Sequence, residues 1–358
     1  MPFDHSTEAS AELLEHREQL APHGLKPFWD IAIAPLKAQA VELALALDLF
    51  STLTKPHTVA VIAARHGLHP ANSQAWLALL WSLGLLDRDT ETEPETPRYR
   101  TSALAALHFD NGNLDCRAAW RFRVATMTGF AKELEGLVRG SPARPPIADG
   151  PPPASWANAA RVQIAQEQAA VSVPAFLNWL AQSPPLPVQG RFLDLGGGPG
   201  LIALAFARQM PGWSATVFDL PEPVSVAAEN IQAAGLADRI AVLGGDLARD
   251  DIGSGYDLIW CSSVLHFVED PEAALARAVA ALKPGGVLVT AHAEQPSDAG
   301  IARQVLPFYL PMMLRGRHVP DENAMVTAMA RAGLVDIQTD GWLPFPLAPV
   351  RVHRGRRP

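Results

Sequence analysis

Short apolar runs alternate with amphipathic segments from Arg191 onward, and this pattern constrains the fold more than any other feature of the chain. Five runs have the length and apolar content of buried strands: RFLDLGGG, SATVFDL, RIAVLGGDL, YDLIWCSSVL and GGVLVTAHA. Helices are predicted between them at LIALAFARQM, PVSVAAENIQAAG and PEAALARAVAALK. This alternation predicts a parallel sheet with helices on both faces. The last stretch, VDIQTDGWLPFPLAPVRVHRG, predicts a closing antiparallel hairpin.

The N-terminal part is helical and has a winged-helix pattern. Apolar residues recur at helical spacing from Ile31 to Phe50, a short helix ends at Gly67, and a second one opens near Pro70. The segment RYRTSALAAL then has the position of a wing. Because this pattern is typical of DNA-binding proteins, the composition of its second helix is decisive.

The second helix lacks the side chains that a DNA-recognition helix needs. No Lys or Arg occurs between Ala71 and Leu86, although contacts with phosphates and base edges require basic and polar groups. The net charge of −8 also disfavours nucleic acid and anionic membranes as partners. The helix instead carries an apolar stripe, which we expect in a core or a dimer interface. The stripe consists of Trp76, Leu79, Leu80 and Leu83.

Composition is typical of an intracellular globular protein. The two cysteines, Cys116 and Cys261, form neither a CxxC motif nor a disulfide framework. The N-terminal segment MPFDHSTEASAELLEHREQL is polar and has no apolar core of a signal peptide. No stretch reaches the ~18 uncharged apolar residues of a membrane helix. We therefore expect a cytoplasmic protein without a membrane partner.

A glycine loop follows the first strand of the alternating region and opens a helix. The loop LDLGGGPG places Gly196, Gly198 and Gly200 at alternate positions after Asp194. Glycine lets the backbone turn sharply and approach a ligand closely. A dinucleotide site would have its third glycine one residue later, where this chain has Leu201. The shorter loop suits S-adenosylmethionine (SAM), which has no pyrophosphate, with Asp194 reaching its methionine end.

Carboxylates also end the next two predicted strands. Asp219, followed by Leu220, is placed to accept hydrogen bonds from both ribose hydroxyls. Asp246 is placed to accept the adenine amino group, while Leu247 packs on the ring. Because the carboxyl ends of parallel strands meet at one edge of a sheet, these residues and the glycine loop predict a single SAM site.

As an ordered set, DLGGGPG, FDLP, GGDL, VLHFVEDPEAAL and LKPGG resemble the motifs of the small-molecule O-methyltransferases of plant and bacterial secondary metabolism. The resemblance covers about residues 30 to 340. It implies a Rossmann-like class I methyltransferase domain with a terminal antiparallel hairpin, and Ser262 beside the adenosyl group. The family's general base is a histidine after the fourth strand, and the matching residue is His266.

The resemblance also implies a role for each part of the chain. Residues 1–24 are predicted to be a flexible arm, and residues 25–110 an all-α, winged-helix-like dimerisation domain. Residues 111–185 are predicted to form a helical connector and substrate-pocket region, with a Pro-rich loop at 141–153. Residues 186–358 are the α/β SAM-binding catalytic domain. The implied assembly is a homodimer that acts on a small molecule.

Three departures from the family pattern surround the predicted base. Phe267 replaces the Asp that usually follows this histidine. His292 and His318 stand where the O-methylating members have two glutamates. Three histidines are poor as a proton relay, but neutral imidazoles are good ligands for Fe or Zn. The resemblance to the α-keto acid C-methyltransferase branch, which holds a metal at these positions, implies an iron or zinc ion on His266, His292 and His318.

Such a metal would explain C-methylation, because the β-carbon of a 2-oxo acid becomes nucleophilic as an enolate that a chelated Lewis acid stabilises. We therefore predict C-methylation of a small 2-oxo acid, with aromatic 2-oxo acids among the candidates. O-methylation of a phenol or hydroxyl with His266 as general base stays open, as does SAM binding without methyl transfer. Arg121 or Arg123 is a candidate to meet a substrate carboxylate. Candidate pocket walls are Trp120, Phe122, Phe130, Phe308 and Met312.

Overall fold

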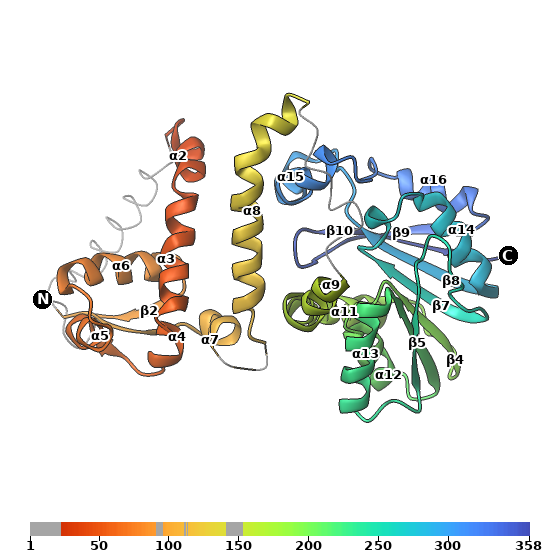
Figure 1. Ribbon diagram of the computed structural model, residues 1–358, viewed down its shortest axis with the longest axis horizontal. Coiled ribbons are helices and arrows are strands. Elements are labelled where there is room, and N and C mark those ends of the chain that lie inside the picture. Colours follow the sequence, from red (N-terminus) through yellow and green to blue (C-terminus); the bar gives the residue numbers. More distant parts are fainter. Residues whose placement is uncertain (1–22, 91–95, 111, 113, 141–152) are drawn as a thin grey trace, which may run out of the picture. The chain divides into compact units, whose positions relative to one another are not determined.

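The computed structural model divides the chain into two units, Met1–Asp110 and Asn111–Pro358, each described by itself below (Figure 1). The predicted arm at 1–24 lies outside the described residues except for its last two positions, and the Pro-rich loop at 141–153 except for its last. The described ranges are 23–90, 96–110, 112, 114–140 and 153–358. No helix in these ranges is long and apolar enough to cross a membrane.

The first unit combines helices with a small antiparallel sheet. The predicted wing at RYRT is β3, which pairs with both other strands in the order β1-β3-β2, so the unit is not purely helical. Thr58 caps α5 by accepting the Val61 N–H, and Gly67 ends it in the left-handed conformation. The elements are α2 (Lys26–Ala32), α3 (Ala34–Ala46), α4 (Leu49–Thr52), β1 (His57–Thr58), α5 (Val59–His66), α6 (Pro70–Ser82), β2 (Leu86–Asp89), β3 (Arg98–Thr101) and α7 (Ala103–Phe109).

The apolar stripe of α6 packs inside the unit itself. Leu80 is fully buried, and the Trp76 indole N–H donates to the Ala40 carbonyl of α3 at 3.1 Å. Leu80 therefore lies in a core, one of the two expected places of the stripe, whereas Trp76, Leu79 and Leu83 are only partly buried. Large apolar side chains are exposed instead on α2 and α3, where Phe28 is 65% and Ile31 is 74% exposed.

The second unit contains a seven-stranded sheet in the order β6-β5-β4-β7-β8-β10-β9. The first five of these strands are parallel, and β10 runs antiparallel to both β8 and β9. This is the parallel sheet with a terminal hairpin that the sequence predicts. The strands are β4 (Gly190–Leu195), β5 (Trp213–Asp219), β6 (Ile240–Gly244), β7 (Tyr256–Ser262), β8 (Leu282–His292), β9 (Val335–Leu343) and β10 (Val350–Arg356).

Helices cover both faces of this sheet (Figure 1). One face packs on α11 (Val173–Gln182), α12 (Leu201–Gln209) and α13 (Pro221–Ala233), and the other on α14 (Pro271–Ala281) and α16 (Ala324–Arg331). Successive residues of a strand alternate between these cores, because side chains alternate across a strand. In β7, Trp260 faces the first core and Cys261 the second.

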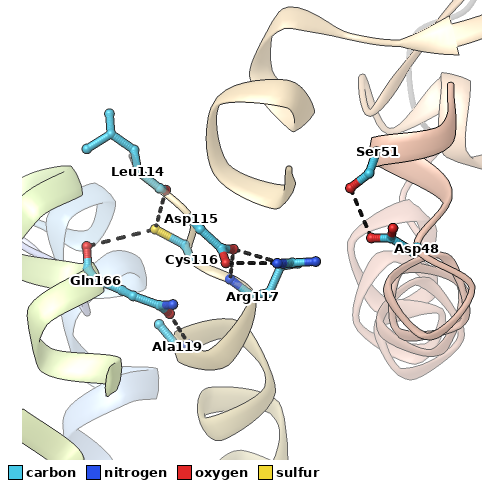
Figure 2. A network of polar contacts seen from close by, with 8 residues as sticks. All are labelled: Asp48, Ser51, Leu114, Asp115, Cys116, Arg117, Ala119 and Gln166. Carbon is cyan, nitrogen blue, oxygen red and sulfur yellow. Dashed lines mark hydrogen bonds and ion pairs between the residues drawn. The ribbon is translucent and has the colours of Figure 1, made fainter. Parts of the chain in front are cut away.

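The remaining helical segments precede the sheet or follow β7 and β8. At the start of α8, the Gln166 side-chain oxygen accepts the Ala119 backbone N–H at 2.8 Å, so α8 and α10 are joined (Figure 2). The segments are α8 (Arg117–Val138), α9 (Pro153–Ala159), a π-helical turn at Ala160–Ile164, α10 (Ala165–Glu167), a second π-helical turn at Gln168–Ser172, a 3-10 turn at Leu265–Phe267 and α15 (Ala299–Leu314).

Candidate active site

The glycine loop after β4 has three left-handed residues. Gly196, Gly198 and Gly200 have φ of 76°, 56° and 76°. A Cβ at Gly196 would lie 2.6 Å from Val264 Cβ, and one at Gly200 would lie 3.0 Å from Ala227 Cβ. At Gly198 the nearest atom would be 3.7 Å away. Packing therefore disfavours a side chain at Gly196 and Gly200, whereas a Cβ at Gly198 would meet Ile164 and Gln168 at ordinary contact distance.

We expect Gly196→Ala to destabilise the protein more than Gly198→Ala. Both changes strain a left-handed backbone, at about 1–2 kcal/mol. Gly196→Ala also forces its Cβ against Val264, which adds about 1–3 kcal/mol of overpacking. The unfolding midpoint in urea measures both losses. Equal losses would show that the Val264 contact relaxes freely.

Asp219 closes the glycine loop from the end of β5. Its Oδ2 accepts the Gly198 N–H and its Oδ1 accepts the Leu220 N–H, both at 2.7 Å. Burial raises the pKa of this carboxyl to about 6, against the lowering effect of the two backbone hydrogen bonds. A carboxylate has about four acceptor sites, so two remain for the ribose hydroxyls of SAM.

Asp194 lies beneath the loop. Its carboxylate is 1% exposed and accepts the Ala203 N–H of α12 at 3.2 Å. Burial raises its pKa to about 7, with a smaller contribution from the charge of Asp219. The carboxylate thus joins the loop to the helix that follows, and its contact with the methionine end of SAM stays a prediction.

Gln168 is a loop contact that the sequence did not reveal. Its side-chain Nε2 donates to the Gly197 carbonyl at 3.2 Å, and its Oε1 accepts the Leu201 N–H at 3.3 Å. The residue begins the second π-helical turn, a local geometry that is frequent at functional sites. No spacing rule could identify Gln168, because it lies on a helix far from the glycine motif in sequence.

The other predicted SAM contacts lie at the same edge of the sheet. Asp246 follows β6, and its Oδ1 accepts the Ala248 N–H at 2.9 Å, which shapes the turn. Leu247 is 5% exposed and belongs to the core beneath this turn. Ser262 ends β7. The remaining lone pairs of Asp219 fit the ribose hydroxyls of SAM, whereas the cofactor contacts of Gly198, Asp246 and Leu247 stay predictions.

His266 lies in the 3-10 turn after β7 and is 6% exposed. Its ring centroid is 4.3 Å from that of Phe267 and 5.9 Å from that of Tyr309. Burial lowers the pKa of His266 to about 4, and the charges of Arg317 and His318 add to this effect. No described residue forms a hydrogen bond with the imidazole. His266 is therefore neutral, with a nitrogen lone pair available.

Tyr309 of α15 is a second residue that the sequence did not single out. It is 3% exposed and its ring centroid lies 5.9 Å from that of His266; burial raises the pKa of Tyr309 to about 12, against a lowering effect of the Ser263 side chain. Ser263 itself has a φ of 50°, a strained conformation for a residue with a Cβ. The predicted pocket walls Phe122 and Phe308 are instead exposed at 39% and 38%.

The three predicted metal ligands do not form one site. The Nε2 of His292 accepts backbone N–H groups from Val264 at 3.3 Å and Leu265 at 3.1 Å, so a metal at Nε2 would displace both. His318 is exposed, whereas His266 and His292 are buried. No group of three or more His, Cys, Asp or Glu residues in the described ranges could hold a metal ion. The predicted iron or zinc site is therefore not supported.

Two of the three arginines considered as partners of a substrate carboxylate already form ion pairs within the protein. Arg123, a candidate for a substrate carboxylate, already forms two 2.7 Å hydrogen bonds with Glu167. Arg315, after α15, pairs with Glu133 of α8 at 3.0 Å. Arg317 donates from Nη1 to the Phe267 carbonyl at 3.2 Å. Arg317 therefore lies against the turn that carries His266.

A buried pair holds the segment after β8. Glu294 and His353 are at most 1% exposed, and Glu294 Oε1 lies 2.9 Å from His353 Nε2. Thr339 Oγ1 lies 2.8 Å from His353 Nδ1, and Glu294 Oε2 accepts the Asn323 N–H at 3.0 Å. This network joins β9, β10 and the start of α16, so His353 has a structural role.

Comparison with known proteins identifies relatives along most of the chain. A family model for a methyltransferase domain matches residues 193–288. The 3-hydroxy-5-methyl-1-naphthoate 3-O-methyltransferase of Streptomyces sahachiroi is 29% identical over 265 residues, 73% of this chain and 74% of that protein. The tetracenomycin polyketide synthesis 8-O-methyl transferase TcmO of Streptomyces glaucescens is 29% identical over 319 residues, 84% of this chain and 89% of that protein.

The solved structures agree on the fold. Human N-acetylserotonin methyltransferase in complex with SAM has a TM-score of 0.70 at 21% identity, over 94% of this chain and 99% of that one. At this identity the likeness shows the fold, a helical N-terminal region followed by a Rossmann-like domain. Together with the family model and the curated relatives, it identifies the chain as a class I SAM-dependent methyltransferase whose homologues are small-molecule O-methyltransferases of bacterial secondary metabolism.

Proposed function

We propose that this methyltransferase methylates a hydroxyl oxygen of a small aromatic compound, with His266 as the general base. The observation that carries this proposal is the state of His266: a buried, neutral imidazole without a hydrogen-bond partner among the described residues, next to the carboxyl end of β7. A hydroxyl bound beside it can donate its proton to the free lone pair as the oxygen attacks. SAM supplies an electrophilic methyl group on a sulfonium.

Aromatic side chains around His266 favour a flat substrate. Phe267 and Tyr309 lie against the imidazole, and the Trp156 ring stands edge-on to Phe267 at 5.6 Å. Aromatic rings prefer such offset or edge-to-face partners. One Streptomyces relative is named for a hydroxynaphthoate and the other for tetracenomycin polyketide synthesis, and the naphthoate supports the same substrate class.

O-methylation agrees with the relatives better than C-methylation of a 2-oxo acid. C-methylation would need an enolate stabilised by a metal, and the three histidines do not form a metal site among the described residues. A phenol needs a base alone, because its oxygen is already the nucleophile. The two Streptomyces relatives that match most of the chain are named as O-methyltransferases.

Product analysis tests the proposal. The purified protein is incubated with SAM and either a set of naphthols and phenols or a set of aromatic 2-oxo acids, with and without EDTA. We expect O-methyl ethers by mass spectrometry, at rates that EDTA leaves unchanged. A β-methyl 2-oxo acid that EDTA suppresses would contradict the proposal. SAM binding without any methylated product from either set would favour a non-methylating protein.

We also propose that the protein is a homodimer formed through the first unit. Phe28, Trp29, Ile31 and Leu36 expose large apolar surfaces on α2 and α3, each more than half accessible. Exposed apolar patches of this kind mark protein interfaces. An obligate interface would bury roughly 2,000 Å² or more.

Light scattering tests this assembly. We expect twice the chain mass for the wild type, and a monomer for the double variant Phe28→Glu/Ile31→Glu, because a charge on an apolar interface is costly to bury. Leu107→Glu on α7 is the control, since Leu107 is 48% exposed outside the α2–α3 patch. A wild-type monomer at micromolar concentration would rule out the dimer.

A further inference from the structure

His292 presents a buried hydrogen-bond donor that no described residue accepts. Its Nε2 accepts two backbone N–H groups, from Val264 and Leu265. A neutral imidazole carries a single proton, so the proton of His292 is on Nδ1. Nδ1 is buried without a partner among the described residues. A buried N–H without an acceptor is unfavourable, so an acceptor atom supplied by a ligand would stabilise it.

Arg317 contributes further donors near His266. One N–H of its guanidinium is bonded to the Phe267 carbonyl, the residue that follows His266. Among the described carboxylates none forms an ion pair with Arg317, although Arg123 and Arg315 each have a glutamate partner. A guanidinium has five N–H donors in a planar fork, so Arg317 retains several.

His292 and Arg317 both lie near the proposed base. The ring centroids of His266 and His292 lie 6.5 Å apart at 78°, a separation that one small molecule can span. A glutamate at position 292, as in the family pattern, would accept hydrogen bonds. His292 instead accepts backbone N–H groups at Nε2 and has an N–H at Nδ1 that can be donated to a ligand. A substrate group that accepts hydrogen bonds would therefore suit His292, whereas a group that donates them would suit a glutamate.

We propose that His292 and Arg317 bind the carboxylate of an aromatic hydroxy acid and hold it with its hydroxyl next to His266. A carboxylate provides several acceptor sites in one plane, which match an Arg fork and a further N–H. It also supplies the negative charge that Arg317 lacks within the described part of the chain. This inference names the substrate class of the proposed O-methylation and rests on it.

A matched pair of compounds tests the proposal. The probes are 3-hydroxy-2-naphthoate and 2-naphthol, which share ring and hydroxyl and differ by the carboxylate. Binding is measured by calorimetry with S-adenosylhomocysteine present, and methyl transfer by kcat/KM. The variants are Arg317→Met, which removes the charged fork, and His292→Glu, which still accepts the two backbone N–H groups but no longer donates. Arg315→Met is the control, with the same charge change two residues away on a paired arginine.

We expect the wild type to prefer the acid, and each test variant to reduce this preference about 10- to 100-fold, the range for hydrogen bonds to a charged group. Arg315→Met should leave the preference unchanged. Equal losses for both compounds, or a wild type that binds the acid no more tightly than the naphthol, would overturn the proposal. If the acid binds through Arg317 but neither compound is methylated, the carboxylate subsite stands and the O-methylation proposal fails. Unchanged SAM binding in each variant confirms that it is folded.

Discussion

Replacement of His266 by Gln is expected to lower kcat about 10²- to 10⁴-fold, the usual contribution of a positioned general base. Gln keeps a polar side chain of similar size but cannot take up a proton, so binding of SAM should be unchanged. Steady-state kinetics with an accepted naphthol and calorimetry with SAM measure the two effects.

His318→Gln is the matched control for this loss. His318 is exposed and lies near His266, but the O-methylation mechanism gives it no proton to carry. We expect kcat to stay within a few-fold of the wild type. A loss as large as that of His266→Gln would revive a joint role for the histidines.

The pH profile gives an independent check on the base. The base is active as neutral imidazole, and burial together with Arg317 and His318 lowers its pKa to about 4. The acid limb of kcat/KM is therefore expected near pH 4, not near 6.5, the ordinary value of His. Arg317→Met should move the limb to higher pH, because it removes a cation that disfavours the imidazolium. A wild-type limb near 6.5 would contradict the observed environment of His266.

Asp219→Ala should weaken SAM binding by roughly 1–3 kcal/mol, which is about a 5- to 150-fold higher Kd. The change leaves the ribose hydroxyls of SAM without acceptors and frees the Gly198 N–H from its partner, so the loop loses its closure. Asp219→Asn keeps one acceptor and should show a smaller loss.

Calorimetry with SAM measures these affinities. Asp238→Ala, at an exposed position after α13, controls for the loss of one negative charge and should bind SAM as the wild type does. If Asp219→Ala binds SAM with unchanged affinity, Asp219 does not contact the cofactor.

Local patterns were sufficient for the architecture and for the position of the cofactor loop. Buried strands appear in the sequence as apolar runs, and Gly196, Gly198 and Gly200 fit the left-handed turn that follows the first strand. These are properties of short segments, so they are readable without tertiary contacts. The parallel sheet and its terminal hairpin followed from the alternation and from the last two strands.

The apolar stripe of α6 shows a limit of sequence periodicity as a guide to tertiary contacts. Its periodicity correctly indicates a buried face, but it does not say which surface covers that face. In the folded unit α3 contacts Trp76 and Leu80 is fully buried, and the most exposed apolar side chains lie on α2 and α3. Burial inside a unit and burial between subunits require the same residues, so only the three-dimensional arrangement separates them.

The roles of the three histidines depended most strongly on the tertiary structure. Their positions in sequence are compatible with a metal site, a base or a structural role, because imidazole can donate, accept or ligate. Tertiary structure assigns them differently: His266 has a free lone pair, His292 already accepts two backbone N–H groups, and His318 is exposed. The same holds for Gln168 and Tyr309, whose contacts join segments that are distant in sequence. Residue type limits what a side chain can bind, whereas its partners depend on which groups the fold brings within hydrogen-bonding distance.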